Sequence, residues 1–320
     1  MKFIAYWPMS INKALDISVP PLYLKGPMPL ITATIPAYNG VSRYLEHAIR
    51  SALAQSVAED MELIVVDDAS TDETEQLVRR YPNVRYVRRT QNGGQAAARN
   101  DGARLAKSEF LAFLDQDDLW EPTFLEETLA VLSKHPDAAV VHADGHQVNE
   151  HNDIMHYDAA MKHTNSITQI LRGGHDVATS GSLFRKTCFD VVGGYDEQLS
   201  IWEDIDLAIR LYQRFPLIHL PKPLYRHRLY GHNASRGIPS ESLLRGQQRF
   251  LEKHEPMCRK GSREARALKR DWAHYYGDLG KYLLQRHCAN EARQAFFRAL
   301  SFSPFDHKLL LRLLRSYFIR

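Results

Sequence analysis

The chain has 320 residues, of which 44% are hydrophobic and 25% are charged, and its formal net charge is +3 at pH 7. This length and composition predict a folded α/β core with room for a smaller appended unit. No segment approaches the roughly 18 consecutive apolar residues that a membrane-spanning helix needs. Its three cysteines, Cys188, Cys258 and Cys288, are too few and too far apart for a disulfide framework or a zinc cluster.

The two ends of the chain differ from the middle. Residues 1–28 are rich in proline, and we interpret them as an N-terminal extension outside the fold. Pro8 interrupts the first apolar stretch and no small-residue cleavage site follows, so we expect no signal peptide and a cytoplasmic protein. Residues 241–320 hold 17 Lys and Arg against 8 Asp and Glu, a net of +9, whereas the rest holds 24 against 30, a net of −6. A solvated helical face is the common reason for such a basic tail, and an anionic partner is the alternative.

The first half of the chain alternates between apolar, β-branched runs, which predict strands, and stretches of helical periodicity. The expected strands are residues 30–36, 62–66, 84–87 and 110–114. The expected helices are residues 44–53, a segment that follows a capping box of Ser70 and Glu73 and runs to about residue 81, and residues 94–106. This alternation predicts a doubly wound, Rossmann-like α/β sheet of mostly parallel strands, which we assign to residues 29–238.

After Pro239 the pattern becomes helical, and we assign residues 239–320 to a basic helical C-terminal region. The expected helices are residues 243–254, 264–286, 291–300 and 307–318. Residues 309–320 are apolar with interspersed arginines. They can pack against the preceding helices or lie on an anionic membrane surface, and the pattern leaves both possibilities open.

An acidic run, residues 115–118, directly follows the expected strand at 110–114. In doubly wound sheets, ligands bind beyond the carboxyl ends of the strands. Asp115 and Asp117 would repel each other unless a positive charge lies between them, and Mg²⁺ or Mn²⁺ prefers one or two carboxylates together with phosphate oxygens. The run is therefore a candidate site for a cation bound to a nucleotide diphosphate. The alternative is a surface turn with capping aspartates.

Polar groups occupy two matching positions upstream. Asp67 and Asp68 directly follow the expected strand at residues 62–66, where they can accept hydrogen bonds from a base or ribose, or cap a helix. Gly94 has no side chain, so another group can approach the backbone closely there. Arg99 follows it as a partner for acidic groups. An ordinary junction between a loop and a helix would look the same.

A later acidic segment precedes an amphipathic helix. Asp204 falls in the first turn of that helix, outside its apolar stripe, with Glu203 and Asp206 as neighbours. The helix dipole favours its ionised form, while the neighbouring acids raise its proton affinity, so it is a candidate general base near neutral pH. The alternative is that these acids only stabilise the start of the helix through its dipole.

Taken together, these segments closely resemble the family-2 inverting glycosyltransferases of the GT-A fold over residues 30–236. Six stretches in the family's order and spacing carry the resemblance, namely residues 34–39, 65–72, 98–100, 113–118, 193–197 and 203–204. The resemblance implies in-line transfer of a sugar from a nucleotide diphosphosugar to an acceptor hydroxyl, assisted by Mn²⁺ or Mg²⁺. It favours a UDP-sugar donor and a saccharide or lipid-linked acceptor, as in surface polysaccharide or glycolipid synthesis, and no nucleic acid is expected.

The resemblance also implies roles for single residues. Asp204 is the expected base, with Glu203 beside it as a second catalytic residue. Asp117 is the expected metal ligand, and Asp115 faces the ribose and the metal. The expected donor-binding residues are Pro36, Ala37, Tyr38, Asn39, Asp67, Asp68, Gly94, Arg99, Asp115 and Gln116.

One departure concerns the metal. Tyr230 stands where the family often has a histidine that helps to hold the metal or diphosphate, and we expect His232, ahead of His227, to take this role. Arg226 and Arg228 are further candidates for phosphate contact. The alternative functions are a catalytically silent sugar-nucleotide-binding protein with a partner-recruiting tail, and a nucleotidyltransferase.

Overall fold

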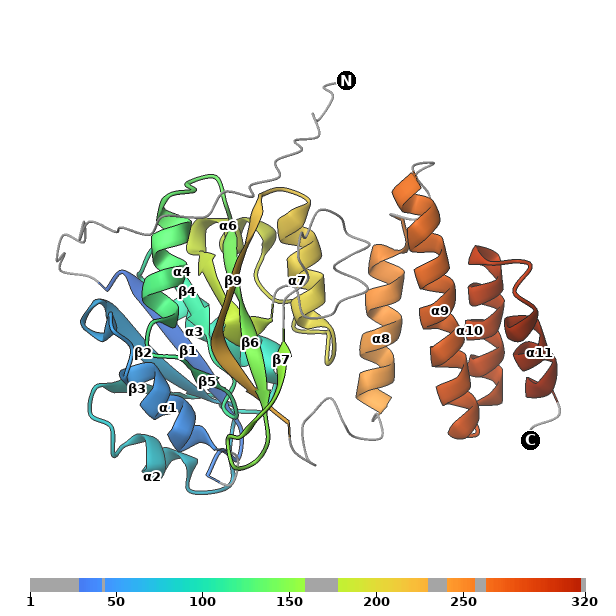
Figure 1. Ribbon diagram of the computed structural model, residues 1–320. Helices are drawn as coiled ribbons and strands as arrows, with labels where there is room; N and C mark the ends of the chain where they lie inside the picture. The colour runs from blue at the N-terminus through green and yellow to red at the C-terminus, as the bar shows by residue number, and fades with distance from the viewer. Residues whose placement is uncertain (1–28, 42–43, 159–177, 230–240, 257–262, 318–320) are drawn as a thin grey trace.

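The computed structural model describes residues 29–41, 44–158, 178–229, 241–256 and 263–317. A central sheet with helices on both faces forms one part of the molecule, and a stack of helices lies beside it (Figure 1). The strands are β1 (Ile31–Ala37), β2 (Met61–Asp67), β3 (Val84–Arg88), β4 (Phe110–Phe113), β5 (Leu119–Trp120), β6 (Val140–Val148), β7 (Ile154–Asp158), β8 (Ser182–Arg185) and β9 (Leu217–Arg228). The helices are α1 (Leu45–Leu53), α2 (Thr74–Val78), α3 (Gln95–Leu105), α4 (Phe124–Ser133), α6 (Lys186–Val192), α7 (Glu203–Tyr212), α8 (Glu241–His254), α9 (Arg263–Gln285), α10 (Ala289–Phe302) and α11 (His307–Ser316), with short 3₁₀ turns η1 (Ala58–Asp60) and η2 (Thr179–Gly181).

The strands of the described chain form a single sheet in the order β3-β2-β1-β4-β8-β6-β9-β5, with β7 beside β6. β1, β2, β3, β4, β6 and β9 run in one direction, and β5, β7 and β8 run against them. The expected doubly wound sheet of mostly parallel strands is confirmed. Every residue of β1 is buried, as in a central strand that is covered on both faces.

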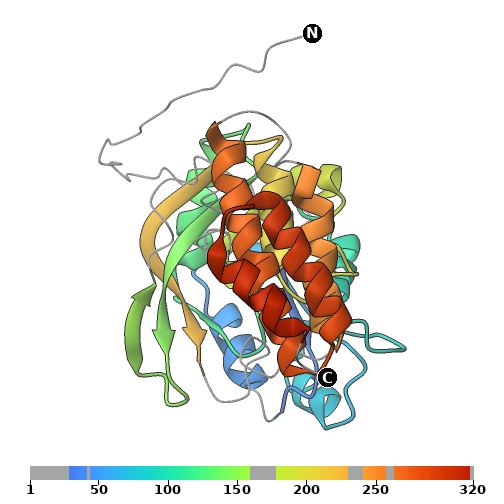
Figure 2. The same ribbon diagram turned by 90° about the vertical axis from the view of Figure 1, so that its right-hand side faces the viewer.

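Two layers of helices cover the sheet. Side chains of α1, α2 and α4 share a core with alternate residues of β1, β4 and β6 on one face. On the other face α3, α6 and α7 pack on β4, β6 and β8, and this core continues without a break into α8, α9, α10 and α11. Figure 2 shows the C-terminal helices from their outer side, stacked in front of the sheet. The helical region therefore extends the core of the α/β part.

The capping box expected at Ser70 and Glu73 is wrong. Helix α2 begins at Thr74, and Glu73 makes no side-chain cap. Ala69 has a φ of 62°, and the Ser70 hydroxyl accepts a hydrogen bond from the Asn39 amide. The Ser70 hydroxyl oxygen, which would have capped the helix, is therefore used in a contact with the loop after β1. The backbone turn at Ala69 accompanies this contact.

Helix α11 packs on the preceding helices through one side and leaves several leucines exposed. Leu309 and Leu313 are buried among the preceding helices, so the helix does pack on them. Leu310, Leu311 and Leu314 are 48%, 52% and 51% exposed. In the described part of the chain, no helix has the length and apolar character needed to cross a membrane.

Candidate functional site

A cavity of about 900 Å³ opens at the carboxyl ends of β1, β2 and β4. We call it the strand-end cavity. Its other lining residues come from η2, from the segment that leads into α7, and from Arg245 of α8. The lining residues that the sequence identified are Pro36, Ala37, Tyr38, Asp68, Gly94, Arg99, Asp115, Gln116, Asp117, Glu203 and Asp204. Residues far apart in the sequence thus meet at one site of a size that suits a small-molecule ligand.

Arg99, on α3, is the cation at the centre of this site. Its Nη2 lies 2.5 Å from Asp115 Oδ1, and its Nη1 lies 2.9 Å from Glu203 Oε1. Gln95 Nε2 donates a further hydrogen bond to the same Glu203 oxygen, at 2.5 Å. Burial of Arg99 opposes its charged form, but the charges of Asp115, Tyr195 and Glu203 outweigh burial and raise its pKa. One charged and buried arginine therefore joins the end of β4 to the start of α7.

The aspartates after β4 have different surroundings. Asp118 is buried, and its carboxylate accepts hydrogen bonds from the Ser180 hydroxyl at 2.7 Å and the Arg228 amide at 3.0 Å. Burial raises the pKa of Asp118 well above its ordinary value, and the charges of Asp117 and Asp115 add to this. Asp117 is half-buried on the cavity wall. All three aspartates line the cavity, but the Asp118 carboxylate is buried and supports the turn, while Asp115 and Asp117 are half-buried.

A divalent cation fits this donor set only together with a ligand. In the part of the chain that the structure describes, no group of three or more His, Cys, Asp and Glu side chains is arranged to hold a metal. Asp115 and Asp117 supply carboxylate oxygens, and Mg²⁺ commonly binds one or two carboxylates plus phosphate oxygens and water. His232 lies outside the described residues, whereas His227 lines the strand-end cavity.

Asp204 lies in the first turn of α7 and lines the strand-end cavity. Its Oδ1 accepts a hydrogen bond from the Ile205 amide at 2.8 Å. Burial, followed by the charge of Glu203, raises the pKa of Asp204 to about 7. A carboxylate with this pKa exchanges a proton near neutral pH, as a general base must.

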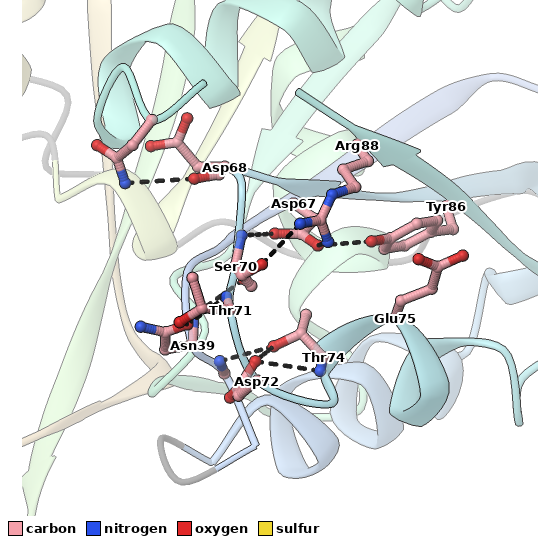
Figure 3. A network of polar contacts seen from close by, with 12 residues as sticks. Asn39, Asp67, Asp68, Ser70, Thr71, Asp72, Thr74, Glu75, Tyr86 and Arg88 are labelled. Carbon is pink, nitrogen blue, oxygen red and sulfur yellow. Dashed lines mark hydrogen bonds and ion pairs between the residues drawn. The ribbon is translucent and has the colours of Figure 1, made fainter. Parts of the chain in front are cut away.

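Asp67, expected in the nucleoside pocket, instead lies beneath the loop after β2. Its carboxylate accepts hydrogen bonds from the Ser70 amide at 2.7 Å, the Tyr86 hydroxyl at 2.5 Å and Arg88 Nη1 at 3.1 Å (Figure 3). Asn39 accepts from the Thr71 amide at 2.9 Å in the same network. Neither Asp67 nor Asn39 lines the strand-end cavity. In this structure local donors hold these two side chains in the loops, and their role in donor binding stays a prediction.

Asp68 does line the cavity, but its carboxylate organises the backbone. It accepts hydrogen bonds from the Gly93 amide at 2.9 Å and the Gly94 amide at 2.7 Å, and it forms an ion pair with Arg89. Gly94 has a φ of 84°, a conformation that favours glycine. These two amides therefore face Asp68, and the turn before α3 is built around that carboxylate.

The side chain of Gln116 joins the loops after β4 and β1. Its Oε1 accepts a hydrogen bond from the Tyr38 amide at 3.0 Å, and its Nε2 donates to the Tyr38 carbonyl at 3.3 Å. The Tyr38 side chain is 42% exposed beside the cavity. Gln116 thereby fixes the backbone that presents this ring.

The two arginines of β9 that were candidates for phosphate contact do not line the cavity. Arg226 Nε donates to Glu121 at 2.6 Å. Arg228 is buried with its guanidinium over the Tyr44 ring, and its Nε donates to the Asp117 carbonyl at 3.1 Å. Their carboxylate and carbonyl partners come from other segments, which the strand pattern could not reveal.

Sequence reasoning missed several lining residues, among them Gln95, Ser180, Tyr225 and Arg245. A Cβ atom at Gly145 or Gly181 would lie within 2.6 Å of the Tyr225 ring, so these glycines make room for that side chain. Gln95 directly follows Gly94 and lies one helical turn before Arg99, whereas Ser180 and Arg245 reach the site through the packing of distant segments.

The model of the family described as "Glycosyl transferase family 2" matches residues 32–193. The chain belongs to this family. Among curated relatives of this family member, chondroitin synthase of Escherichia coli is 28% identical over 65% of the chain and 30% of that protein. Hyaluronan synthase of Pasteurella multocida is 28% identical over 65% of the chain and 21% of that protein. The chain thus spans less than a third of the length of either relative.

Solved structures share the fold of this family-2 member. S. aureus TarS 1–349, in complex with UDP-GlcNAc, has a TM-score of 0.61 and 20% identity, and the match covers 90% of this chain and 89% of that one. Mannosyltransferase PcManGT from Pyrobaculum calidifontis, in complex with GDP-Man and Mn²⁺, has a TM-score of 0.55 and 18% identity over 96% and 84% of the two chains. At these identities the likeness establishes the fold.

We predict that Arg99→Met destabilises the protein by about 3 to 5 kcal/mol, because it leaves two carboxylates near the cavity without their buried cation. Arg104→Met, on the same helix, removes an arginine that is 61% exposed although it also pairs with two acids. It should cost less than about 1 kcal/mol. Urea denaturation of both variants measures the difference. Equal losses would contradict the central role of Arg99.

Proposed function

We propose that the protein transfers a sugar from a nucleotide diphosphosugar to an acceptor hydroxyl, with inversion at the anomeric carbon. One observation carries the proposal. Asp204, with its pKa raised to about 7, lines the same cavity as the strand-end carboxylates Asp115 and Asp117. An inverting transfer needs a base and a site for the leaving diphosphate in one cavity, because the two act on opposite faces of the same sugar.

The donor would lie along the strand ends. The exposed ring of Tyr38 offers a stacking surface for the nucleobase, with Pro36 and Ala37 behind it. Asp115 would face the ribose and, with Asp117, the diphosphate. UDP is the nucleotide that we favour, in line with the UDP-GlcNAc bound to the TarS structure.

Mn²⁺ or Mg²⁺ is the proposed cofactor, held by Asp117 and Asp115 together with the phosphate oxygens. When bound, it supplies charge neutralisation for the leaving diphosphate, which is worth several kcal/mol at the transition state. Arg99 keeps Asp115 in place through their ion pair. His232, or His227 on the cavity wall, would complete the set of ligands.

Asp204 would act at the other end of the reaction. Its Oδ1 accepts from the Ile205 amide, so Oδ2 is the oxygen that takes the acceptor's proton. As the acceptor oxygen bonds to the anomeric carbon, the bond from that carbon to the diphosphate oxygen breaks on the far side, and the proton remains on Asp204. Glu203 acts through Arg99 and through the pKa of Asp204.

The alternative is a silent protein that binds sugar nucleotides. A protein of that kind has no use for a carboxylate of raised pKa on the acceptor side of the cavity. The basic C-terminal helices would then serve to recruit a partner. The two functions differ in whether Asp204 is needed for turnover.

We also propose that α11 contacts an anionic membrane surface, which would make the protein cytoplasmic and peripheral. Leu310, Leu314 and Tyr317 lie on one exposed side, at spacings of four and three residues. The helix also carries Arg312 and Arg315, and α11 has no acidic residue. Exposed leucines next to basic side chains are the pattern of helices that lie in the headgroup region.

The base assignment predicts that Asp204→Asn lowers kcat by about 10² to 10⁴, because the amide cannot take the acceptor's proton. Release of nucleoside diphosphate from a panel of nucleotide sugars measures this, with Asp190→Asn on α6 as the control. In the wild type kcat/KM should rise with pH and level off above about 7, as Asp204 loses its proton. Full turnover by Asp204→Asn would exclude this base and favour the silent-binding alternative.

The metal assignment predicts that Asp117→Ala abolishes the gain in UDP affinity that Mn²⁺ gives the wild type, because it removes a carboxylate ligand. Titration calorimetry with and without Mn²⁺ measures binding without turnover. Asp137→Ala, at an exposed position away from the cavity, is the control. An unchanged Mn²⁺ effect in Asp117→Ala would reject the assignment.

The membrane proposal predicts co-sedimentation of the full chain with vesicles that contain anionic phospholipid, and less with zwitterionic vesicles. The double variant Leu310→Ser and Leu314→Ser should abolish it, since the exposed apolar surface is lost. Phe297→Ser, at an exposed position on α10, is the control. If the double variant sediments as the wild type does, the proposal is wrong.

A further inference from the structure

Helix α8 lies against the segment that leads into α7, although the two belong to regions that the sequence separates. A Cβ atom at Gly246 would lie 2.7 Å from the Ser200 hydroxyl and 3.1 Å from the Ser200 amide. The absence of a side chain therefore lets α8 approach the backbone of this segment. Arg245, the preceding residue, reaches the strand-end cavity. The C-terminal helical region thus contributes directly to the wall of the site.

One helical turn further along, α8 packs on the residue just before the acidic pair. The Trp202 ring lies 5.3 Å from the Phe250 ring of α8 and 5.3 Å from the Tyr275 ring of α9, edge to face in both cases. Trp202 has a φ of 62°, which is strained for a bulky residue. Such strain persists only where the surroundings determine the conformation. Phe250 and Tyr275 provide those surroundings, and the turn at Trp202 sets the direction in which Glu203 and Asp204 leave it.

A third contact lies on the next turn of α8 and involves a buried charge. Asp206 of α7 is 0% exposed. Its Oδ1 lies 2.8 Å from His254 Nε2 and 2.8 Å from Lys253 Nζ, both on α8, while Oδ2 accepts from Arg210 Nε at 2.8 Å. Burial would raise the pKa of Asp206, but the hydrogen bond from His254 and the charges of Arg210 and Lys253 outweigh it and lower the pKa. Asp206 is therefore a carboxylate whose partners come largely from α8.

We propose that α8 is the positioning element for the catalytic base, and that His254 and Phe250 are positioning residues for Asp204. This rests on the proposed role of Asp204 as the base. On the donor side, Arg99 of α3 holds Asp115. Trp202 and Asp206, on either side of the acidic pair, are both held by α8. Misplacement of a reacting group by about 1 Å can cost a hundredfold in rate. Loosening α8 should therefore slow the chemical step and leave donor binding intact.

The test uses His254→Phe, which removes the hydrogen bond to Asp206 and keeps a ring beside Phe250. We expect kcat to fall at least tenfold, while the affinity for UDP by calorimetry changes less than twofold. His254→Gln keeps a donor and should restore part of the rate. The matched control is Glu255→Gln, the next residue, which is buried and pairs with Arg298 of α10. It should destabilise the helices without lowering kcat.

A double variant separates positioning from a general structural effect. If α8 acts through Asp204, then His254→Phe should cause no further loss of kcat in the Asp204→Asn background. Losses that multiply, or a kcat for His254→Phe equal to that of Glu255→Gln, would overturn the proposal. The Asp204→Asn single variant tests the base itself. Full turnover there would remove the proposed function, whereas an impaired Asp204→Asn with multiplying losses would remove only the role of α8.

Discussion

The bridge from Asp115 through Arg99 to Glu203 holds the two sides of the site together. Arg99 comes from α3, Asp115 follows β4 and Glu203 begins α7, so one guanidinium sets the distance between the sheet and the helix that carries Asp204. An unpaired buried charge is very unfavourable, which makes the three groups dependent on each other. The pKa of Asp204 follows from the same arrangement. Burial raises this pKa most and the charge of Glu203 adds to the rise, while Arg99 partly offsets both.

Several acids at the strand ends serve the shape of the loops rather than the cavity. Asp67 takes donors from Ser70, Tyr86 and Arg88, and Asp118 takes them from Ser180 and the Arg228 amide. Each of these carboxylates is buried with its donors in place, as buried polar groups must be. Asp118 also lines the cavity, but its carboxylate is occupied by these donors, whereas Asp115 and Asp117 are only half-buried there. The buried acids Asp67 and Asp118 thus hold the loops around the cavity in shape.

The helical C-terminal region belongs to this arrangement. Its apolar core is continuous with the core on one face of the sheet, and α8 places Phe250 and His254 against the two residues that flank the acidic pair on α7. A boundary near residue 239 marks a change from alternating strands to helices. It does not mark two separate cores, because side chains of α7, α8 and α9 fill one interior.

Local pattern was enough to predict the α/β alternation, the C-terminal helices and the acids at the strand ends, because burial on both faces of a strand and helical periodicity leave direct traces in the order of residues. It also identified Arg99 as a partner for acids and Asp204 as a residue of raised proton affinity. Tertiary structure alone decided that Asp67 and Asn39 support loops, that Ser70 does not cap α2, and that Tyr225 and Arg245 reach the cavity. The reason is physical. A side chain's role depends on which donors and acceptors lie within about 3 Å of it. Those atoms come from segments far apart in the chain, and the local sequence does not show which segments will meet.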